Sequence, residues 1–144
     1  MPDKRTALKT IAEKLEGHHW FIDSGMAVEI YTKGKRIAKD IDIVTLEDEF
    51  EEVARRLNAK ITVRSVDKGK LKIFWEKYAS GLVEGVKVEI VCGSGKVTIR
   101  GKERNMKVTS DHLVCVKRLR YLGVEVNVAP REEIIVHKSL MGRE

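Results

Sequence analysis

Two aspartates separated by one isoleucine are the residues of this chain whose types and spacing could do chemistry. Asp40 and Asp42 flank Ile41, and the apolar residues Ile43 and Val44 follow directly. Side chains alternate along a β-strand, so both carboxylates would lie on one face, about 7 Å apart. Like charges at that distance repel each other unless a cation neutralises them. Hard oxygen ligands suit Mg²⁺ or Mn²⁺, and two such ions commonly bind the phosphate oxygens of a nucleotide.

A third carboxylate supports this interpretation. Glu89 lies in a second apolar segment, residues 86–91, where Val88 and Ile90 would face the core. If this strand pairs with the aspartate strand, all three acids share the face that points away from the core. Two alternatives stay open, because an Asp-x-Asp sequence also occurs in solvated turns and Glu89 could be an exposed residue of an edge strand.

Ser24-Gly25 stands upstream, where a short apolar strand turns into an expected helix. The order of these segments resembles the nucleotidyltransferases of the DNA polymerase β superfamily. Members of that family carry Gly-Gly or Gly-Ser after an apolar strand, then Asp-x-Asp or Asp-x-Glu, and a third acid on a later strand. The resemblance therefore implies a nucleotidyltransferase-like fold and the transfer of a nucleoside monophosphate from a triphosphate.

The chain looks most similar to the small prokaryotic branch that includes abortive-infection-type toxins. That branch has an arginine shortly before the first aspartate, here Arg36, and a late Gly-Val-x-Val segment, here residues 123–126. An acidic turn and an apolar run that ends in Lys138 follow. There are departures: Ser24 replaces the first glycine, Ala38 stands where threonine is frequent, and the sequence ends at Glu144, where relatives usually continue. We therefore expect a shortened protein.

The resemblance implies a role for each candidate residue. Asp40, Asp42 and Glu89 would hold two Mg²⁺ or Mn²⁺ ions, with Glu89 also acting as a base. Ser24 and Gly25 would present backbone N–H groups to phosphate at a helix N-terminus. Arg36 and Lys138 would add positive charge near the triphosphate. The plainer alternatives are that Ser24 only caps a helix, that Arg36 is solvated, and that Lys138 belongs to the polar face of a terminal helix.

The elements expected to position these residues alternate between helices and strands. Apolar spacing predicts helices over residues 6–16 and 25–33, a third helix capped by Thr45 with its core side at 50–57, and a last helix at 131–141. Strands are expected at 20–22, 40–44, 60–66, 70–76, 86–91, 96–100 and 124–128, with 60–66 paired to 70–76 and 86–91 paired to 96–100 around residues 92–95, while 110–122 is ambiguous. The predicted class is α+β: a mixed β-sheet with helices mainly on one face, in a single domain over residues 1–144.

Composition narrows the setting. No run of apolar residues approaches the roughly 20 needed to cross a bilayer, and there is no signal-peptide pattern. Cys92 and Cys115 stand in unrelated contexts, which favours a reduced, cytoplasmic environment. A net charge of +6 makes nucleic acid or a polyphosphate a plausible partner. Abundant Lys and Glu together with the lack of Gln lean towards a thermophilic source.

Three functional classes follow. The first is a metal-dependent nucleotidyltransferase that uses a nucleoside triphosphate and an RNA or protein acceptor. The second is a nucleotide- or RNA-binding module on the same fold without catalysis. The third is a toxin–antitoxin component whose activity needs another chain. The sequence does not specify the acceptor, the base or the oligomeric state.

Overall fold

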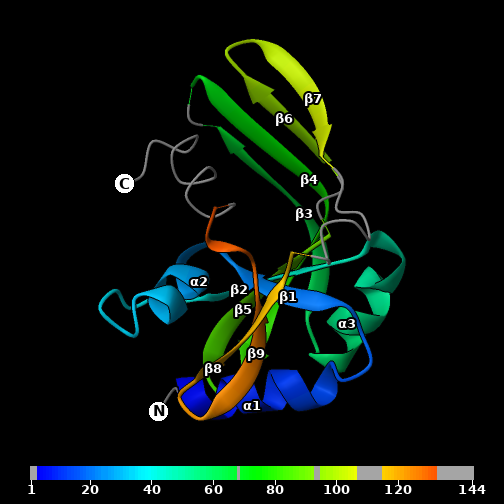
Figure 1. Ribbon diagram of the computed structural model, residues 1–144. Helices are drawn as coiled ribbons and strands as arrows, with labels where there is room; N and C mark the ends of the chain where they lie inside the picture. The colour runs from blue at the N-terminus through cyan, green and yellow to red at the C-terminus, as the bar shows by residue number, and fades with distance from the viewer. Residues whose placement is uncertain (1–2, 68, 93–94, 107–114, 133–144) are drawn as a thin grey trace.

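A mixed β-sheet with short helices packed against it positions the candidate residues (Figure 1). The computed structural model describes residues 3–67, 69–92, 95–106 and 115–132. Its helices are α1 (Lys4–Lys14), α2 (Ser24–Tyr31) and α3 (Phe50–Arg56), with a 3₁₀ helix η1 (Glu47–Glu49) before α3. Its strands are β1 (Trp20–Asp23), β2 (Ile41–Thr45), β3 (Lys60–Asp67), β4 (Leu71–Val83), β5 (Val86–Val91), β6 (Gly95–Ile99), β7 (Lys102–Met106), β8 (Lys117–Tyr121) and β9 (Val124–Val128). The predicted α+β class is confirmed.

The strand order places β2 at the centre of the sheet. Within the described residues, the order is β7-β6-β4-β5-β2-β1-β9-β8, and β3 pairs with β4. Strand β2 is antiparallel to β1 and parallel to β5, so the sheet is mixed. Strand β4 is long enough to pair with β6 through its first half and with β5 through its second half. The strands on either side of β2, β1 and β5, therefore bring residues from distant parts of the chain next to it.

The core forms where apolar helix faces meet the inner strands. In α1, Ala7, Leu8 and Ile11 recur at helical spacing and are fully buried. Asp3 caps the N-terminus of this helix, since its side chain accepts a hydrogen bond from the backbone N–H of Thr6 at 3.2 Å. Further buried apolar residues come from α2, α3 and the strands, including Ile22, Met26, Ala27, Ile41, Ile43, Phe50, Val53, Val88, Ile90 and Val126. No helix in the described part of the chain is long and apolar enough to cross a membrane.

One predicted strand pair is wrong. Residues 86–91 and 96–100 were expected to form a hairpin, but β5 pairs with β2 and β4, whereas β6 pairs with β4 and β7. The glycine-rich residues between the two strands favoured a tight turn. The pairing instead depends on β4, whose length lets both strands lie along the same edge.

Other boundaries also differ from the prediction. Thr45 ends β2 and its hydroxyl donates to the His19 carbonyl at 2.6 Å, so it does not cap the next helix. Helix α2 begins at Ser24 and buries Glu29, a residue that the apolar pattern did not assign to the core. In the ambiguous segment, residues 117–121 form strand β8, while 110–114 lie outside the described residues. The helix expected at 131–141 also lies outside them beyond residue 132.

Candidate functional site

Acidic side chains form a row across three neighbouring strands. The register sets Asp23 of β1 opposite Asp42 of β2, and Asp42 opposite Glu89 of β5. Neighbouring strands are about 4.8 Å apart, so the three acids occupy successive places on one face of the sheet. Alternation turns Ile41 and Ile43 to the other face, where they are fully buried. Asp40 directly precedes β2 and adds a fourth carboxylate near the row. The predicted pairing of Glu89 beside Asp42 is therefore present.

The row is electrostatically strained by its own charges. Burial is the largest cause that raises the pKa of Asp42, to about 8, and a hydrogen bond with Glu89 adds to it. The negative charges of Glu89, Asp23 and Asp40 raise it further. Asp42 therefore keeps its proton more readily than an ordinary aspartate, because a second full charge in this place is unfavourable. A cation beside Asp42 would remove that cost.

Glu89 has the opposite environment, because donors from three strands meet its carboxylate. The Tyr78 hydroxyl donates to Glu89 Oε1 at 2.7 Å, and Arg64 Nη1 donates to the same oxygen at 2.8 Å. Lys87 Nζ lies 3.4 Å from it. Burial alone would raise the pKa of Glu89, but the hydrogen bonds with Asp42 and Tyr78 and the nearby cations lower it to about 2. Glu89 is thus a carboxylate that stays charged.

Arg64 and Tyr78, which both contact Glu89, also contact each other. The Arg64 guanidinium lies over the Tyr78 ring, 5.3 Å from its centroid, and also donates to the Tyr78 hydroxyl at 3.0 Å. An irregularity in the β3–β4 pairing between Thr62 and Arg64 accompanies this arrangement. The expected pairing of strands 60–66 and 70–76 is confirmed, but neither residue was predicted for the site, because Tyr78 lies beyond the expected strand and both contacts depend on the exact register.

The entry to α2 lies directly beside the row. Ser24 has a backbone φ of 55°, in the left-handed region where glycine is favoured. Its N–H donates to Asp23 Oδ1 at 2.8 Å, so this N–H is already occupied. A Cβ on Gly25 would lie 3.7 Å from the Ala38 Cβ, an ordinary contact. Packing therefore does not require glycine at position 25.

A buried ion pair fixes the segment that leads to Asp40. Glu29 is 1% exposed, and its Oε1 accepts from Lys4 Nζ at 2.6 Å and from the Ala38 N–H at 2.8 Å. Its Oε2 accepts from the Tyr121 hydroxyl at 2.6 Å. Lys4 also donates to the Ala38 carbonyl at 2.7 Å, so both backbone groups of Ala38 are bound. The network joins α1, α2 and β8 to the residues just before the acidic row.

Comparison with solved structures gives the fold. The chain resembles TM1012 of Thermotoga maritima, a candidate nucleotidyltransferase, with a TM-score of 0.71 and 20% identity over 94% of this chain and 82% of that one. It also resembles the lincosamide antibiotic adenylyltransferase LnuA in its lincomycin-bound form, with a TM-score of 0.56, 16% identity, and coverage of 94% and 85%. The resemblance to ANT(2'')-Ia in complex with adenylyl-2''-tobramycin has a TM-score of 0.55 and 11% identity over 92% of this chain and 73% of that one.

The chain has a nucleotidyltransferase-like fold. No protein-family model matches the sequence, and no curated protein matches it. The similarity therefore concerns the fold. The antibiotics are ligands of the compared proteins only.

The carboxylates of the row are suitable ligands for a divalent cation, but they are not arranged as a complete binding site. Carboxylate oxygens are the ligands that Mg²⁺ and Mn²⁺ prefer, and the raised pKa of Asp42 reflects an excess of negative charge. In the part of the chain that the structure describes, no group of three or more His, Cys, Asp or Glu side chains is spaced to hold a metal ion as it stands. Asp42 and Glu89 are adjacent, whereas a third ligand would need a side-chain movement.

The remaining candidates are placed differently. Arg36 lies in the exposed segment between α2 and β2, ahead of Ala38 and Asp40, and its N–H donates to the Thr32 hydroxyl at 3.3 Å. Lys138 lies outside the described residues. Asp23 was missed by sequence reasoning. Two short apolar segments each carry an aspartate near one end. An expected antiparallel pairing of these segments would have placed Asp23 beside Asp42.

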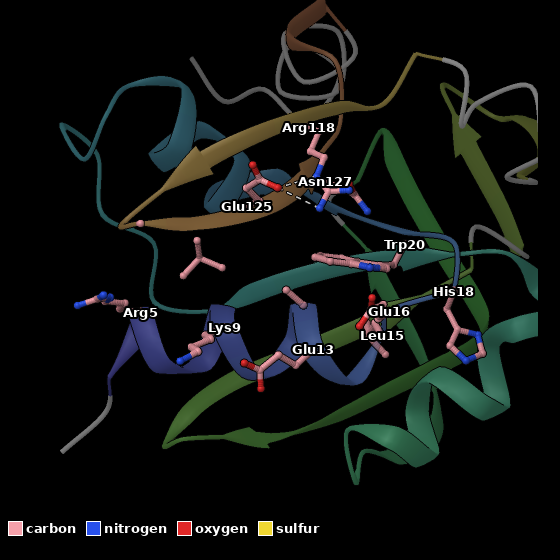
Figure 2. Close-up of a pocket in the computed structure, with 14 residues that line it drawn as sticks. Arg5, Lys9, Glu13, Leu15, Glu16, His18, Trp20, Arg118, Glu125 and Asn127 are labelled. Carbon is pink, nitrogen blue, oxygen red and sulfur yellow. Dashed lines mark hydrogen bonds and ion pairs between the residues drawn. The ribbon is translucent and has the colours of Figure 1, made fainter.

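A groove of about 580 Å³ lies elsewhere, between α1 and the β8–β9 hairpin (Figure 2). Trp20 is one of its lining residues, and alternation along β1 turns Trp20 and Asp23 to opposite faces of the sheet. Its charges balance, with cations from Arg5, Lys9 and Arg118 and acids from Glu13, Glu16 and Glu125. Because its opposite charges balance, the described lining of the groove has neither a cluster of carboxylates for a cation nor an excess of positive charge for an anion.

Proposed function

We propose that the chain is a metal-dependent nucleotidyltransferase that moves a nucleoside monophosphate from a nucleoside triphosphate to a hydroxyl group of an RNA or protein acceptor. The observation that carries the proposal is the pairing of Asp42 with Glu89 in a nucleotidyltransferase-like fold, with Asp23 and Asp40 beside them. Two adjacent strands thus bring carboxylates together at the cost of mutual repulsion. A charged ligand site is the arrangement that offsets such a cost.

In this proposal Asp40, Asp42 and Glu89 hold two Mg²⁺ or Mn²⁺ ions. Bound there, the ions supply positive charge to the phosphate oxygens of the nucleotide. Glu89 serves as a ligand and is also the proposed base. Hydrogen bonds and nearby cations lower its pKa, so it would pass the hydroxyl proton on to water. Arg64 and Tyr78 donate to its Oε1.

The helix entry and the nearby cations are proposed to orient the triphosphate. Since the Ser24 N–H donates to Asp23, the assignment narrows to Gly25, where the absence of a Cβ leaves room for a phosphate oxygen. Arg36 and Lys138 remain proposed sources of positive charge for the triphosphate or the departing pyrophosphate.

The proposed reaction is a single displacement at the α-phosphorus. A bond forms between the acceptor hydroxyl oxygen and the α-phosphorus, and the bond from that phosphorus to the α,β-bridging oxygen breaks. Pyrophosphate leaves with the bridging oxygen, and the hydroxyl proton passes to water. No redox change occurs, so the triphosphate and acceptor are the only reactants.

A binding module without catalysis is the second candidate. It is favoured by the observation that Glu89 Oε1 already has contacts with Arg64, Tyr78 and Lys87, and that the described acids do not form a three-ligand group as they stand. A toxin–antitoxin component remains a further proposal, to be recognised by a partner chain that co-purifies.

Radiolabel transfer separates the two candidates. The purified protein is incubated with Mg²⁺, total RNA and protein extract, and each nucleoside triphosphate labelled either at the α- or at the γ-phosphate. Nucleotidyl transfer predicts label in a macromolecule only from the α-position. Label from the γ-position would mean phosphoryl transfer, and no incorporation together with measurable Mg²⁺-dependent nucleotide binding would favour the binding module.

A further inference from the structure

The strands farthest from the helices and their turns carry most of the net charge of the chain. Residues 64–67, 69–75 and 95–106, here called the β-arm, contain the distal parts of β3 and β4 together with β6 and β7. Figure 1 shows that this part extends away from the helices. Its sequence holds seven Lys or Arg residues and two Asp or Glu residues, a net charge of +5, whereas the net charge of the whole chain is +6.

The tip of the β-arm joins two turns into one basic end. The Arg100 N–H donates to the Lys70 carbonyl at 2.8 Å, which ties the β6–β7 turn to the residue before β4. Lys70, Arg100 and Lys102 are all exposed there, and none of them forms an ion pair with another described residue. Three cations held close together on a fixed backbone form a site for a polyanion and not for a single metal ion.

One face of the β-arm adds an exposed aromatic ring between two lysines. Phe74 is 39% exposed, and the β4–β6 register sets Lys96 opposite it. Lys72 precedes Phe74 by two positions and therefore shares its face. The ion pairs of these lysines are long, at 3.9 Å to Asp67 and 3.6 Å to Glu103, and such exposed pairs contribute little. An aromatic platform flanked by cations is the arrangement that binds single-stranded nucleic acid.

The aromatic platform of β4 does not lie on the face of the acidic row. The irregularity in the β3–β4 pairing between Thr62 and Arg64 adds one residue to β4, which reverses the alternation of its side chains. Phe74 and Lys72 therefore lie on the face of the sheet opposite to Glu89. A ligand bound on this platform is separate from the acidic row.

We propose that the β-arm binds single-stranded RNA. Lys70, Arg100 and Lys102 contact phosphates at the tip, and Phe74 stacks on a base between Lys72 and Lys96. This binding does not rest on the proposed function, so its test uses neither a metal ion nor a triphosphate.

The test is fluorescence anisotropy with a labelled 12-nucleotide single-stranded RNA in EDTA over a salt series. We compare the parent with the tip variant Lys70→Gln/Arg100→Asn/Lys102→Gln. Asparagine suits position 100, where the backbone φ is 50° before Gly101. The matched control is Arg5→Gln/Lys9→Gln/Lys14→Gln, which removes the same charge from exposed positions of α1. A fourth protein, Phe74→Leu, keeps the position apolar and removes the ring.

The tip variant should bind at least tenfold more weakly, and its plot of log affinity against log salt should be less steep by about two, because each lost phosphate contact contributes about 0.7. The control should stay within twofold of the parent. Phe74→Leu should bind at least about fivefold more weakly with an unchanged salt slope. The proposal is overturned if the parent does not bind at 50 mM salt, or if tip and control variants lose the same affinity. Tighter binding to a 12-residue polyglutamate peptide would identify an acidic protein as the partner instead.

Discussion

Asp42 and Glu89 are register partners on parallel strands β2 and β5, and each changes the pKa of the other in the opposite direction. Glu89 stays ionised because donors surround it, whereas Asp42 resists ionisation because it is buried next to that charge. The pair therefore stores repulsion that a cation would relieve. Several consequences of this arrangement can be measured on the folded protein.

Replacing Asp42 by asparagine should stabilise the fold when no divalent ion is bound. Asp42→Asn keeps the shape of the side chain and removes the charge that burial and its acidic neighbours disfavour. In EDTA at pH 8.5 we expect an increase of at least about 1 kcal/mol in the free energy of unfolding, or about 3 °C in melting temperature. The exposed Asp48→Asn serves as a control and should change little. A large loss of stability in Asp42→Asn would mean that the pair is structural.

Removing the Arg64 guanidinium should strengthen the binding of a divalent ion. Arg64 donates to Glu89 Oε1, so its positive charge competes with a cation for the same carboxylate. In Arg64→Gln we expect Mn²⁺ affinity, measured by calorimetry, to rise about threefold or more. Arg118→Gln breaks a comparable pair with Glu125 on the β8–β9 hairpin and should leave the affinity unchanged. Weaker binding in Arg64→Gln would show that Arg64 supports the ligand instead of competing with it.

Glycine at position 24 should stabilise the protein, because Ser24 has a φ of 55° that costs an ordinary residue about 1 kcal/mol or more. Ser24→Gly is expected to raise the free energy of unfolding by about 1 kcal/mol in urea denaturation. Ser24→Ala keeps a Cβ in the same backbone conformation and should not be stabilising. Equal stability of the two variants would show that the backbone conformation at position 24 does not strain the folded protein.

The Glu29 ion pair should make stability depend on pH in the acid range. Burial would raise the pKa of Glu29, but hydrogen bonds from Lys4, Tyr121 and the Ala38 N–H lower it below its ordinary value of 4.5. A depressed folded-state pKa contributes stability above the unfolded pKa, and this contribution is lost as the pH falls through the folded value. The parent should thus lose stability below about pH 4.5 in a way that Glu29→Gln does not.

Glu29→Gln should also be less stable than the parent at pH 7 by about 3 kcal/mol, because it leaves Lys4 without its partner in a largely buried position. Tyr121→Phe removes one donor only and should cost about 1.5 kcal/mol. Burial and then the hydrogen bond to Glu29 raise the pKa of Tyr121 to about 12, which can be checked by spectrophotometric titration. Parallel pH profiles of parent and Glu29→Gln would contradict this account.

Local patterns were sufficient for the elements that carry the acids. Alternation in residues 40–44 and 86–91 placed Asp42 and Glu89 on the faces of two strands, and the pairing of those strands follows from burying Ile41, Ile43, Val88 and Ile90 together. The β5–β6 pairing was predicted wrongly, because the residues between these strands look like a turn and no local signal reveals that β4 pairs with both.

The partners of the acids could not be predicted from the sequence. Arg64 and Tyr78 reach Glu89 only because β3 and β4 pair with an irregular register near Thr62. The apolar pattern gave no reason to bury Glu29, and its burial is favourable because Lys4 and Tyr121, both far away in the sequence, bind its carboxylate. Such contacts are set by tertiary structure, and single-sequence periodicity carries no information about them.

The most direct test of the acidic row is the binding of Mn²⁺ in the presence of a non-hydrolysable α,β-methylene nucleoside triphosphate. Electron paramagnetic resonance counts the bound ions in the parent, in Asp48→Asn and in Asp42→Asn. We predict two ions per chain for the parent and for the control, and a loss of at least tenfold in affinity for Asp42→Asn. Unchanged Mn²⁺ affinity and stoichiometry in Asp42→Asn would contradict the assignment of this row as the nucleotide and metal site.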